Sequence, residues 1–202
     1  MIDVPTLAIR ITVGLAFFAV LLVLDIRKHG RRSPRLQEYG FIAGITLACM
    51  LFGLLHDAVT YAISPEYYIV GKGLIGARDG YFPDVALLAL QATWTVGLLG
   101  GVALVLANNP SDIYPQLTLG ALAKFALLAL AFAVACELAA GILAWIFAGP
   151  IADGIGWNEI MAETWGRRFM AVAGMHYGVY VGGIVALIGA VVGVRRRRKA
   201  EG

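Results

Sequence analysis

The stretch GFIAGITLACMLFGLLHDAVTYAI, residues 40–63, decides the fold class. It is almost entirely apolar and longer than the roughly 20 residues that a helix needs to cross a bilayer. His56 and Asp57 lie next to each other near its end. Ionisable groups in hydrocarbon are costly, so inside a membrane they mark a candidate functional site. This one stretch therefore predicts a membrane-spanning helix and also where its chemistry occurs.

The composition extends this prediction to the whole chain. Sixty per cent of the 202 residues are apolar and only 14% are charged, whereas soluble domains carry about 25% charged residues. Mean hydropathy is +0.80. We therefore expect an all-α, polytopic integral membrane bundle that forms a single transmembrane domain over residues 1–202. The five expected transmembrane helices are residues 6–24, 40–63, 85–107, 117–147 and 169–194.

Basic residues predict the orientation. They cluster in the first loop and again in the tail: Arg27, Lys28, Arg31, Arg32 and Arg35, then Arg195, Arg196, Arg197, Arg198 and Lys199. Loops rich in Lys and Arg stay on the cytoplasmic side. The N-terminus should then face outward, and residues 195–202 should form a basic cytoplasmic tail. We interpret this tail as an anchor at anionic lipid and not as a nucleic-acid site.

Polar residues of four helices fall at similar depth, with Gln91 and Trp94 on the third. His56 lies eight residues before Ser64, and His176 eight residues after Arg168, which puts each roughly 12 Å below the expected outer end of its helix. Glu137 lies roughly 18 Å below the outer end of the fourth helix. These depths predict a polar pocket in the outer half of the bundle.

Imidazole and carboxylate groups together suit a transition metal, here iron, zinc or manganese, with an open position for water or substrate. The first-choice ligands are His56, Glu137 and His176, followed by Asp57 and Glu66. Adjacent helical residues point about 100° apart, so we do not expect His56 and Asp57 both to be central to one small site. Haem is disfavoured because the chain offers one such His pair, towards the outer end.

Other functions remain open at this point. The polar cluster could be a hydrogen-bonded network that fixes helix packing, in an accessory or assembly subunit or a homo-oligomer. An enzyme of redox or hydrolytic type would need a lipidic or periplasmic substrate. A transporter is disfavoured because the inner halves of the helices carry few polar groups beyond Lys124, which can reach the interface. The glycine stripe Gly174, Gly178 and Gly182 is typical of close helix packing.

The segment after residue 63 also has two interpretations. Ser64 suits a helix N-cap, with Pro65 in the first helical position and Glu66 in its first turn. Tyr67 and Tyr68 would then lie in the aromatic belt at the outer interface. Alternatively, Glu66 folds back over the mouth of the pocket.

The residues His56-Asp57-x-x-Thr60, followed by Ile63-Ser64-Pro65-Glu66-Tyr67, resemble a motif of uncharacterised bacterial inner-membrane proteins. The form associated with that group has Gln and Phe where this chain has Ala58 and Tyr68, and its last helix carries a His, as His176 does here. The resemblance implies a multi-pass protein of the bacterial inner membrane in which these residues matter. It implies no reaction.

Overall fold

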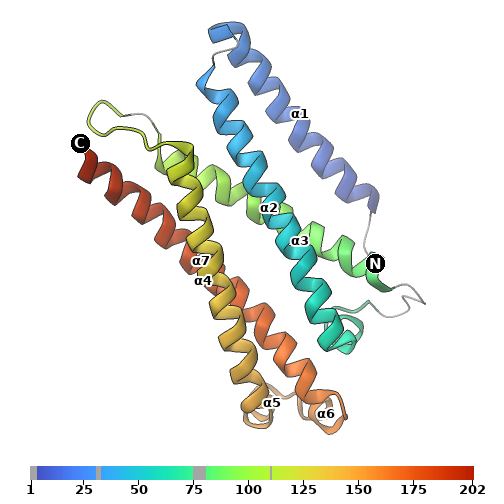
Figure 1. Ribbon diagram of the computed structural model, residues 1–202. Coiled ribbons are helices and arrows are strands. Elements are labelled where there is room, and N and C mark those ends of the chain that lie inside the picture. The colour runs from blue at the N-terminus through green and yellow to red at the C-terminus, as the bar shows by residue number, and fades with distance from the viewer. Residues whose placement is uncertain (1–3, 31–32, 75–80, 110) are drawn as a thin grey trace.

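The computed structural model describes residues 4–30, 33–74, 81–109 and 111–202, and these form helices and connecting segments with no strand among them. Figure 1 shows long helices lying side by side, with short helices at one end. The elements are α1 (Val4–His29), α2 (Pro34–Ile63), the π-helix η2 (Tyr67–Gly71), α3 (Tyr81–Ala107), α4 (Leu119–Ile146), α5 (Ala148–Ile155), α6 (Asn158–Ala162) and α7 (Gly166–Glu201).

Five of these helices are long and apolar enough to cross a membrane, which agrees with the number expected from sequence. Their candidate spans are Ile9–His29, Arg35–Ile63, Pro83–Ala107, Leu119–Ile146 and Gly166–Glu201. The all-α class is thereby confirmed for the described residues. Membrane insertion and the orientation of the termini remain predictions.

Side-chain caps mark the starts of α2 and α4, and the ends of α4 and α7 are also well defined. The Ser33 hydroxyl accepts from the backbone N–H of Arg35 at the start of α2, and Thr118 caps α4 by accepting from Ala121. The long fourth stretch forms one continuous helix over most of its length, since α4 ends at Ile146; the backbone turns at Phe147, and α5 follows. The basic tail is not a separate segment, since α7 continues helically to Glu201.

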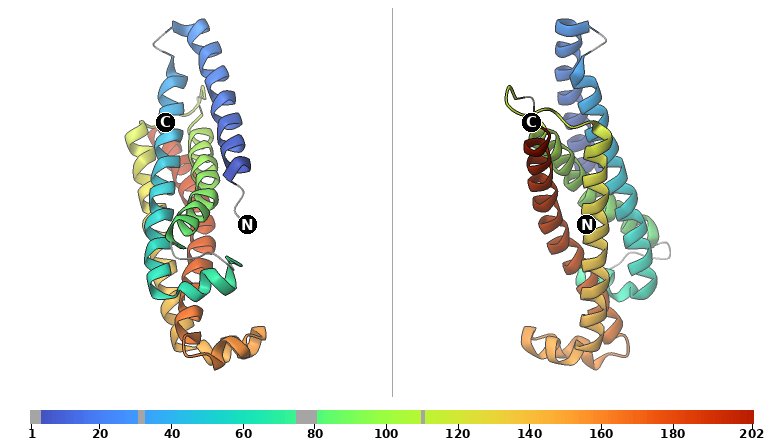
Figure 2. Two further views of the ribbon diagram at one scale, coloured as in Figure 1. Left: turned by 90° about the vertical axis from the view of Figure 1, so that its right-hand side faces the viewer. Right: turned by 60° about the vertical axis from the view of Figure 1, so that its left-hand side comes forward.

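The long helices pack chiefly as two pairs, α2 with α3 and α4 with α7, whereas direct contacts of α2 with α4 and α7 are sparse. Figure 2 shows the two pairs lying against each other and α1 at the edge beside α2. The expected glycine stripe packs against α4. A Cβ on Gly178 would lie 2.6 Å from the Cys136 carbonyl oxygen and 3.0 Å from the Glu137 Cα. This close approach brings Glu137 next to α7.

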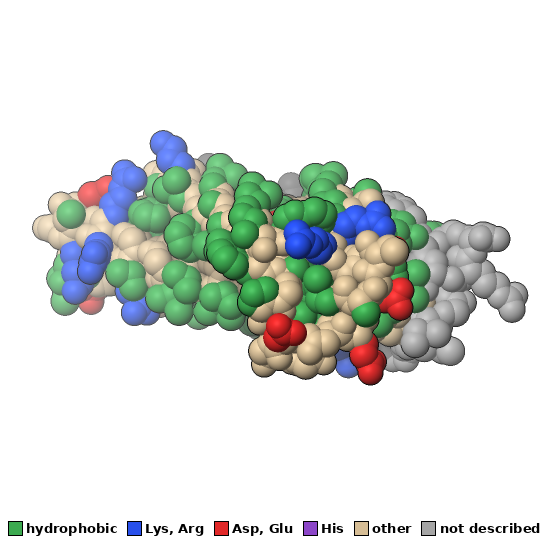
Figure 3. Space-filling model, turned by 90° about the horizontal axis from the view of Figure 1, so that it is seen from below, with side chains coloured by type: hydrophobic (Ala, Val, Ile, Leu, Met, Phe, Trp, Pro, Cys, Tyr) green, Lys and Arg blue, Asp and Glu red, His purple; other side chains and the backbone are tan. Residues whose placement is uncertain are grey.

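Figure 3 views the molecule from the end that carries α5 and α6. Lys and Arg side chains gather in two regions of this view, and hydrophobic side chains lie between them.

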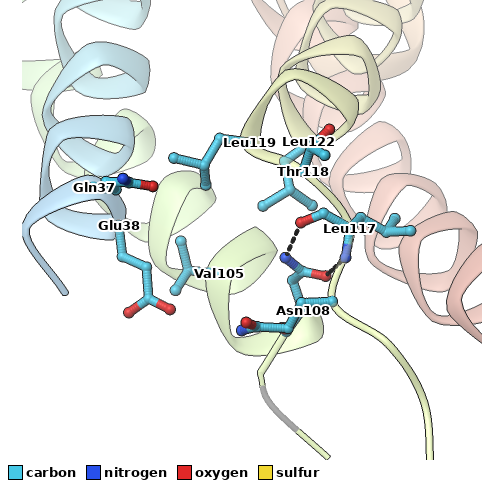
Figure 4. Close-up of a pocket in the computed structure, with 9 residues that line it drawn as sticks. Gln37, Glu38, Val105, Asn108, Leu117, Thr118, Leu119 and Leu122 are labelled. Atoms are coloured by element: carbon cyan, nitrogen blue, oxygen red, sulfur yellow. Dashed lines mark hydrogen bonds between the residues drawn. The ribbon is translucent and has the colours of Figure 1, made fainter. Parts of the chain in front are cut away.

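At the opposite end, a cavity of about 150 Å³ lies between α2, α3 and α4 (Figure 4), with Gln37 and Glu38 among its lining residues. Asn108 closes its base by hydrogen bonds to both backbone groups of Leu117, at 2.9 and 2.8 Å. Gln37 precedes His56 on α2 by about 28 Å of helix. This cavity is therefore separate from the polar cluster.

One residue of the basic cluster is buried. Arg198 is only 7% exposed and donates to four backbone carbonyls, those of Ala107, Asn109, Tyr114 and Pro115, at 2.7–3.2 Å. The carbonyls at a helix C-terminus lack intrahelical donors, and Arg198 supplies a donor to that of Ala107. Arg198 thus ties the end of α7 to the α3–α4 connection.

Candidate metal centre

His56, Asp57 and His176 come together between α2 and α7. Each offers one ligand atom, and the three atoms lie within 4.8 Å of one another. Asp57 Oδ1 is 3.4 Å from His176 Nε2 and 3.7 Å from His56 Nε2. Ligand atoms bound at about 2.1 Å to a tetrahedral ion lie roughly 3.4 Å apart. The observed separations are therefore close to those of a metal site.

The other nitrogen of each imidazole is already engaged. His56 Nδ1 is 2.9 Å from Oε1 of Glu137, and His176 Nδ1 is 3.0 Å from the carbonyl oxygen of Val172. A carbonyl or an ionised carboxylate only accepts, so each Nδ1 carries a proton and donates it. The Nε2 atom of each neutral ring then presents a lone pair, as in a metal-binding histidine oriented by a hydrogen bond on its other nitrogen.

The arrangement brings two imidazole nitrogens and a carboxylate oxygen close together. His56 Nε2 is buried and has no hydrogen-bond partner among the described residues. Lone pairs of two imidazoles and a carboxylate oxygen repel one another unless a cation or protons lie between them. A divalent ion placed between these three atoms would remove the repulsion.

The expectation that adjacent His56 and Asp57 cannot share one small site is wrong for this structure. Both belong to the same group of three potential ligands. The 100° divergence applies to the Cα–Cβ bonds, whereas the imidazole is long enough to bring its Nε2 to within 3.7 Å of Asp57 Oδ1. Side-chain length thus overcomes the divergence of the backbone directions.

Glu137 lies beside the cluster but outside the group of three. Its Oε1 atom accepts from the nitrogen of His56 that faces away from Asp57, and its Oε2 atom is buried without a hydrogen-bond partner among the described residues. The geometry suits Glu137 for orienting His56. Its expected role as a ligand remains a prediction that this arrangement does not support.

Glu66 also lies outside the group. Its Oε2 atom accepts from the Ser64 hydroxyl at 2.8 Å, and its Oε1 atom is 3.9 Å from a guanidinium nitrogen of Arg168. Ser64 itself forms the C-cap of α2, with its backbone N–H donating to Thr60, so the expected N-cap contact is replaced by a hydroxyl donated to Glu66. The Glu66–Arg168 contact thus links the segment after α2 to the start of α7.

Two tyrosines that sequence analysis placed in an interfacial belt are core residues around the cluster. Tyr68 is 0% exposed; its hydroxyl is 2.6 Å from Thr60 Oγ1 and donates to the Asp57 carbonyl at 3.3 Å. Burial and the nearby Asp57 raise the pKa of Tyr68 far above its usual value, so the phenol stays protonated. The Tyr67 ring packs on His176 with centroids 4.6 Å apart. A π-helix at this position, Tyr67–Gly71, was not predictable from composition, although such turns are frequent at functional sites.

Lys72 follows this π-helix and lies at the edge of the cluster. Its Nζ is 3.5 Å from the hydroxyl of Tyr180, and lies 5.4 Å and 5.8 Å from the ring centroids of Tyr67 and Tyr180. Burial lowers the pKa of Lys72, while the charge of Asp57 acts in the opposite direction. Lys72 is therefore a partly buried cation that interacts electrostatically with Asp57, a candidate metal ligand.

These features define a class: an all-helical protein with five helices of membrane-spanning length and a buried His–Asp–His group that could hold a metal ion. No protein-family model, no curated protein and no solved structure matches the chain. The function must therefore be argued from the cluster itself.

Proposed function

We propose that this protein is a membrane metalloprotein that binds a divalent transition metal through His56 Nε2, Asp57 Oδ1 and His176 Nε2. In this proposal Glu137 orients His56. The proposal rests on one observation: Nδ1 of His56 and Nδ1 of His176 each contact a hydrogen-bond acceptor. The Nε2 lone pairs of both histidines therefore face the Asp57 carboxylate.

The ligand set narrows the metal. Two imidazoles and one carboxylate suit iron, zinc or manganese, and three protein ligands leave a position for water or substrate. Such a site would support redox or hydrolytic chemistry. The ring centroids of His56 and His176 are 4.6 Å apart, whereas two axial imidazoles on one haem iron would place them roughly 6 Å apart. This spacing argues against haem.

The proposal also includes the membrane setting. With the N-terminus outside and the basic end of α7 in the cytoplasm, the cluster would lie in the outer half of a bacterial inner membrane. The bilayer would then be the protein's immediate partner, and further membrane subunits or a second copy could pack on its apolar faces.

The test is elemental analysis of the detergent-purified protein after iron, zinc and manganese have each been offered. Wild-type protein should hold close to one metal ion per chain, and His56→Ala and His176→Ala should lose it. His29→Ala is the matched control, because His29 is exposed and pairs with Asp25 at the far end of α1. An optical spectrum of each sample would reveal a haem, which would contradict the proposal.

A folded wild-type protein that holds no metal under any of these conditions would also contradict it. That result would favour the second candidate, a structural network in an accessory or assembly subunit. The hydrogen bonds that join Thr60, Tyr68 and the backbone of His56 and Asp57 favour this candidate, since they connect α2 to η2 without requiring an ion. This candidate predicts that the His56→Ala and His176→Ala variants unfold at a lower temperature than metal-free wild-type protein.

A further inference from the structure

The partly buried ammonium of Lys72 is unusual beside a site for a cation. Tyr67 connects the two, because its ring packs on the His176 ring with centroids 4.6 Å apart and lies 5.4 Å from Lys72 Nζ. Tyr180 forms a second connection, with its ring centroid 6.1 Å from that of His176 and its hydroxyl 3.5 Å from Lys72 Nζ. A positive charge beside the cluster would repel a bound metal ion.

Counting the charges around the cluster gives this cation a role. Glu66, a carboxylate that follows the end of α2, already faces Arg168 at 3.9 Å. Lys72 has no carboxylate within ion-pair distance among the described residues. A metal ion bound by the cluster would add positive charge near this unpaired cation, and a site of low dielectric favours a ligand that offsets it.

We infer that the open coordination position of the metal takes an anionic ligand, a phosphate or carboxylate group, and that Lys72 together with the Tyr180 hydroxyl recognises it. This inference rests on the proposed metal site. Lys72 supplies a charge and Tyr180 a hydrogen-bond donor, the two groups that commonly hold an oxyanion. The burial that disfavours the charged form of Lys72 would be offset once an anion is bound beside it.

The test uses full-length protein loaded with cobalt(II), whose visible spectrum responds to a change of ligand. Azide and inorganic phosphate are titrated into wild type, Lys72→Met and Lys72→Arg in neutral detergent. Wild type should show a saturable spectral change, Lys72→Met should bind each anion about tenfold more weakly or worse, and Lys72→Arg should stay within a few-fold of wild type. Lys124→Met, at an exposed position of α4, is the control.

A second readout separates recognition from a general structural effect. Removal of the Lys72 charge relieves repulsion of the metal, so Lys72→Met should bind cobalt more tightly than wild type while it binds the anions more weakly. A variant that was merely destabilised would lose affinity for both. Replacing inorganic phosphate with short-chain phosphatidic acid identifies the source of the oxyanion: a much tighter response to the lipid indicates a headgroup, and equal responses indicate a soluble anion.

Three results would overturn the inference. If cobalt-loaded wild type shows no spectral change with any of the three anions, or if Lys72→Met binds them as tightly as wild type, Lys72 does not recognise an anion while the metal site stands. If wild type binds no metal at all, the proposed function fails and the inference fails with it. Metal analysis of the same samples distinguishes these cases.

Discussion

His56 and Glu137 lie 81 positions apart in the chain, yet Nδ1 of the first is 2.9 Å from Oε1 of the second. This hydrogen bond links α2 to α4 at a level where those two helices otherwise have sparse contacts. It also fixes which nitrogen of His56 remains free for a metal.

Glu137→Gln should therefore weaken metal binding without abolishing it. The amide can still accept from His56 Nδ1 but lacks the negative charge, and loss of such an orienting partner costs about 10- to 100-fold in metal affinity. Asp57→Asn should have the larger effect, because it removes the anionic ligand itself. Competition titrations with a chromophoric chelator measure both. Equal and complete loss of metal in the two variants would instead make Glu137 a ligand.

Gly178→Ala should disturb the cluster through packing. Its Cβ would lie 2.6 Å from the Cys136 carbonyl oxygen and 2.7 Å from the Ala140 Cβ, so α4 and α7 must separate. Overpacking of this kind typically costs about 1–3 kcal/mol, and here it also displaces Glu137. Thermal unfolding and metal content should both fall. Gly183→Ala, where a Cβ meets nothing within 4 Å, should leave both unchanged.

Tyr68→Phe should reduce stability while metal is retained. The change removes a buried hydroxyl that contacts Thr60 Oγ1 and the Asp57 carbonyl, at a cost of about 1–2 kcal/mol. Denaturant unfolding monitored by circular dichroism gives the difference. Tyr177→Phe is the control, since Tyr177 is 62% exposed. If Tyr68→Phe loses metal as completely as His176→Ala does, the tyrosine has a more direct role than positioning.

Arg198→Met should destabilise the end of the bundle opposite the His56–Asp57–His176 group. Four carbonyl contacts are lost, and the buried carbonyl of Ala107 is left without this donor, so we expect a cost of about 2 kcal/mol or more. Limited proteolysis of the α3–α4 connection should accelerate. Arg196→Met, at an exposed position, serves for comparison. Unchanged metal content in both variants would show that the two ends are independent.

The sequence was sufficient for the long helices, because apolar length is a strong and local signal. It was less informative about helix ends. The end of α4 at Ile146 lies one residue from the predicted end, but the continuation of α7 to Glu201 depends on packing and on the helix-forming character of the charged residues. Arg198 shows the same limit, since nothing in a run of four arginines distinguishes the one that turns inward.

For the cluster, depth along each helix was enough to bring His56, Glu137 and His176 to one level. Depth does not give the direction of a side chain, so it could not tell that Asp57 faces both Nε2 atoms whereas Glu137 takes the Nδ1 side of His56. Rotation of each helix about its own axis decides this, and that rotation is set by contacts such as Gly178 against Cys136. Tyr68 was missed for a related reason: its burial depends on a π-helical turn that its residue type does not signal.

The division of the cluster between α2 and α7 has a consequence for how the protein matures. Chains are synthesised from the N-terminus, and early segments can fold before later ones exist. His56 and Asp57 would therefore reach the bilayer long before His176 completes the set. If all three residues hold the metal as proposed, it would be acquired only after the last helix has been inserted and docked, and loading would mark the end of biogenesis.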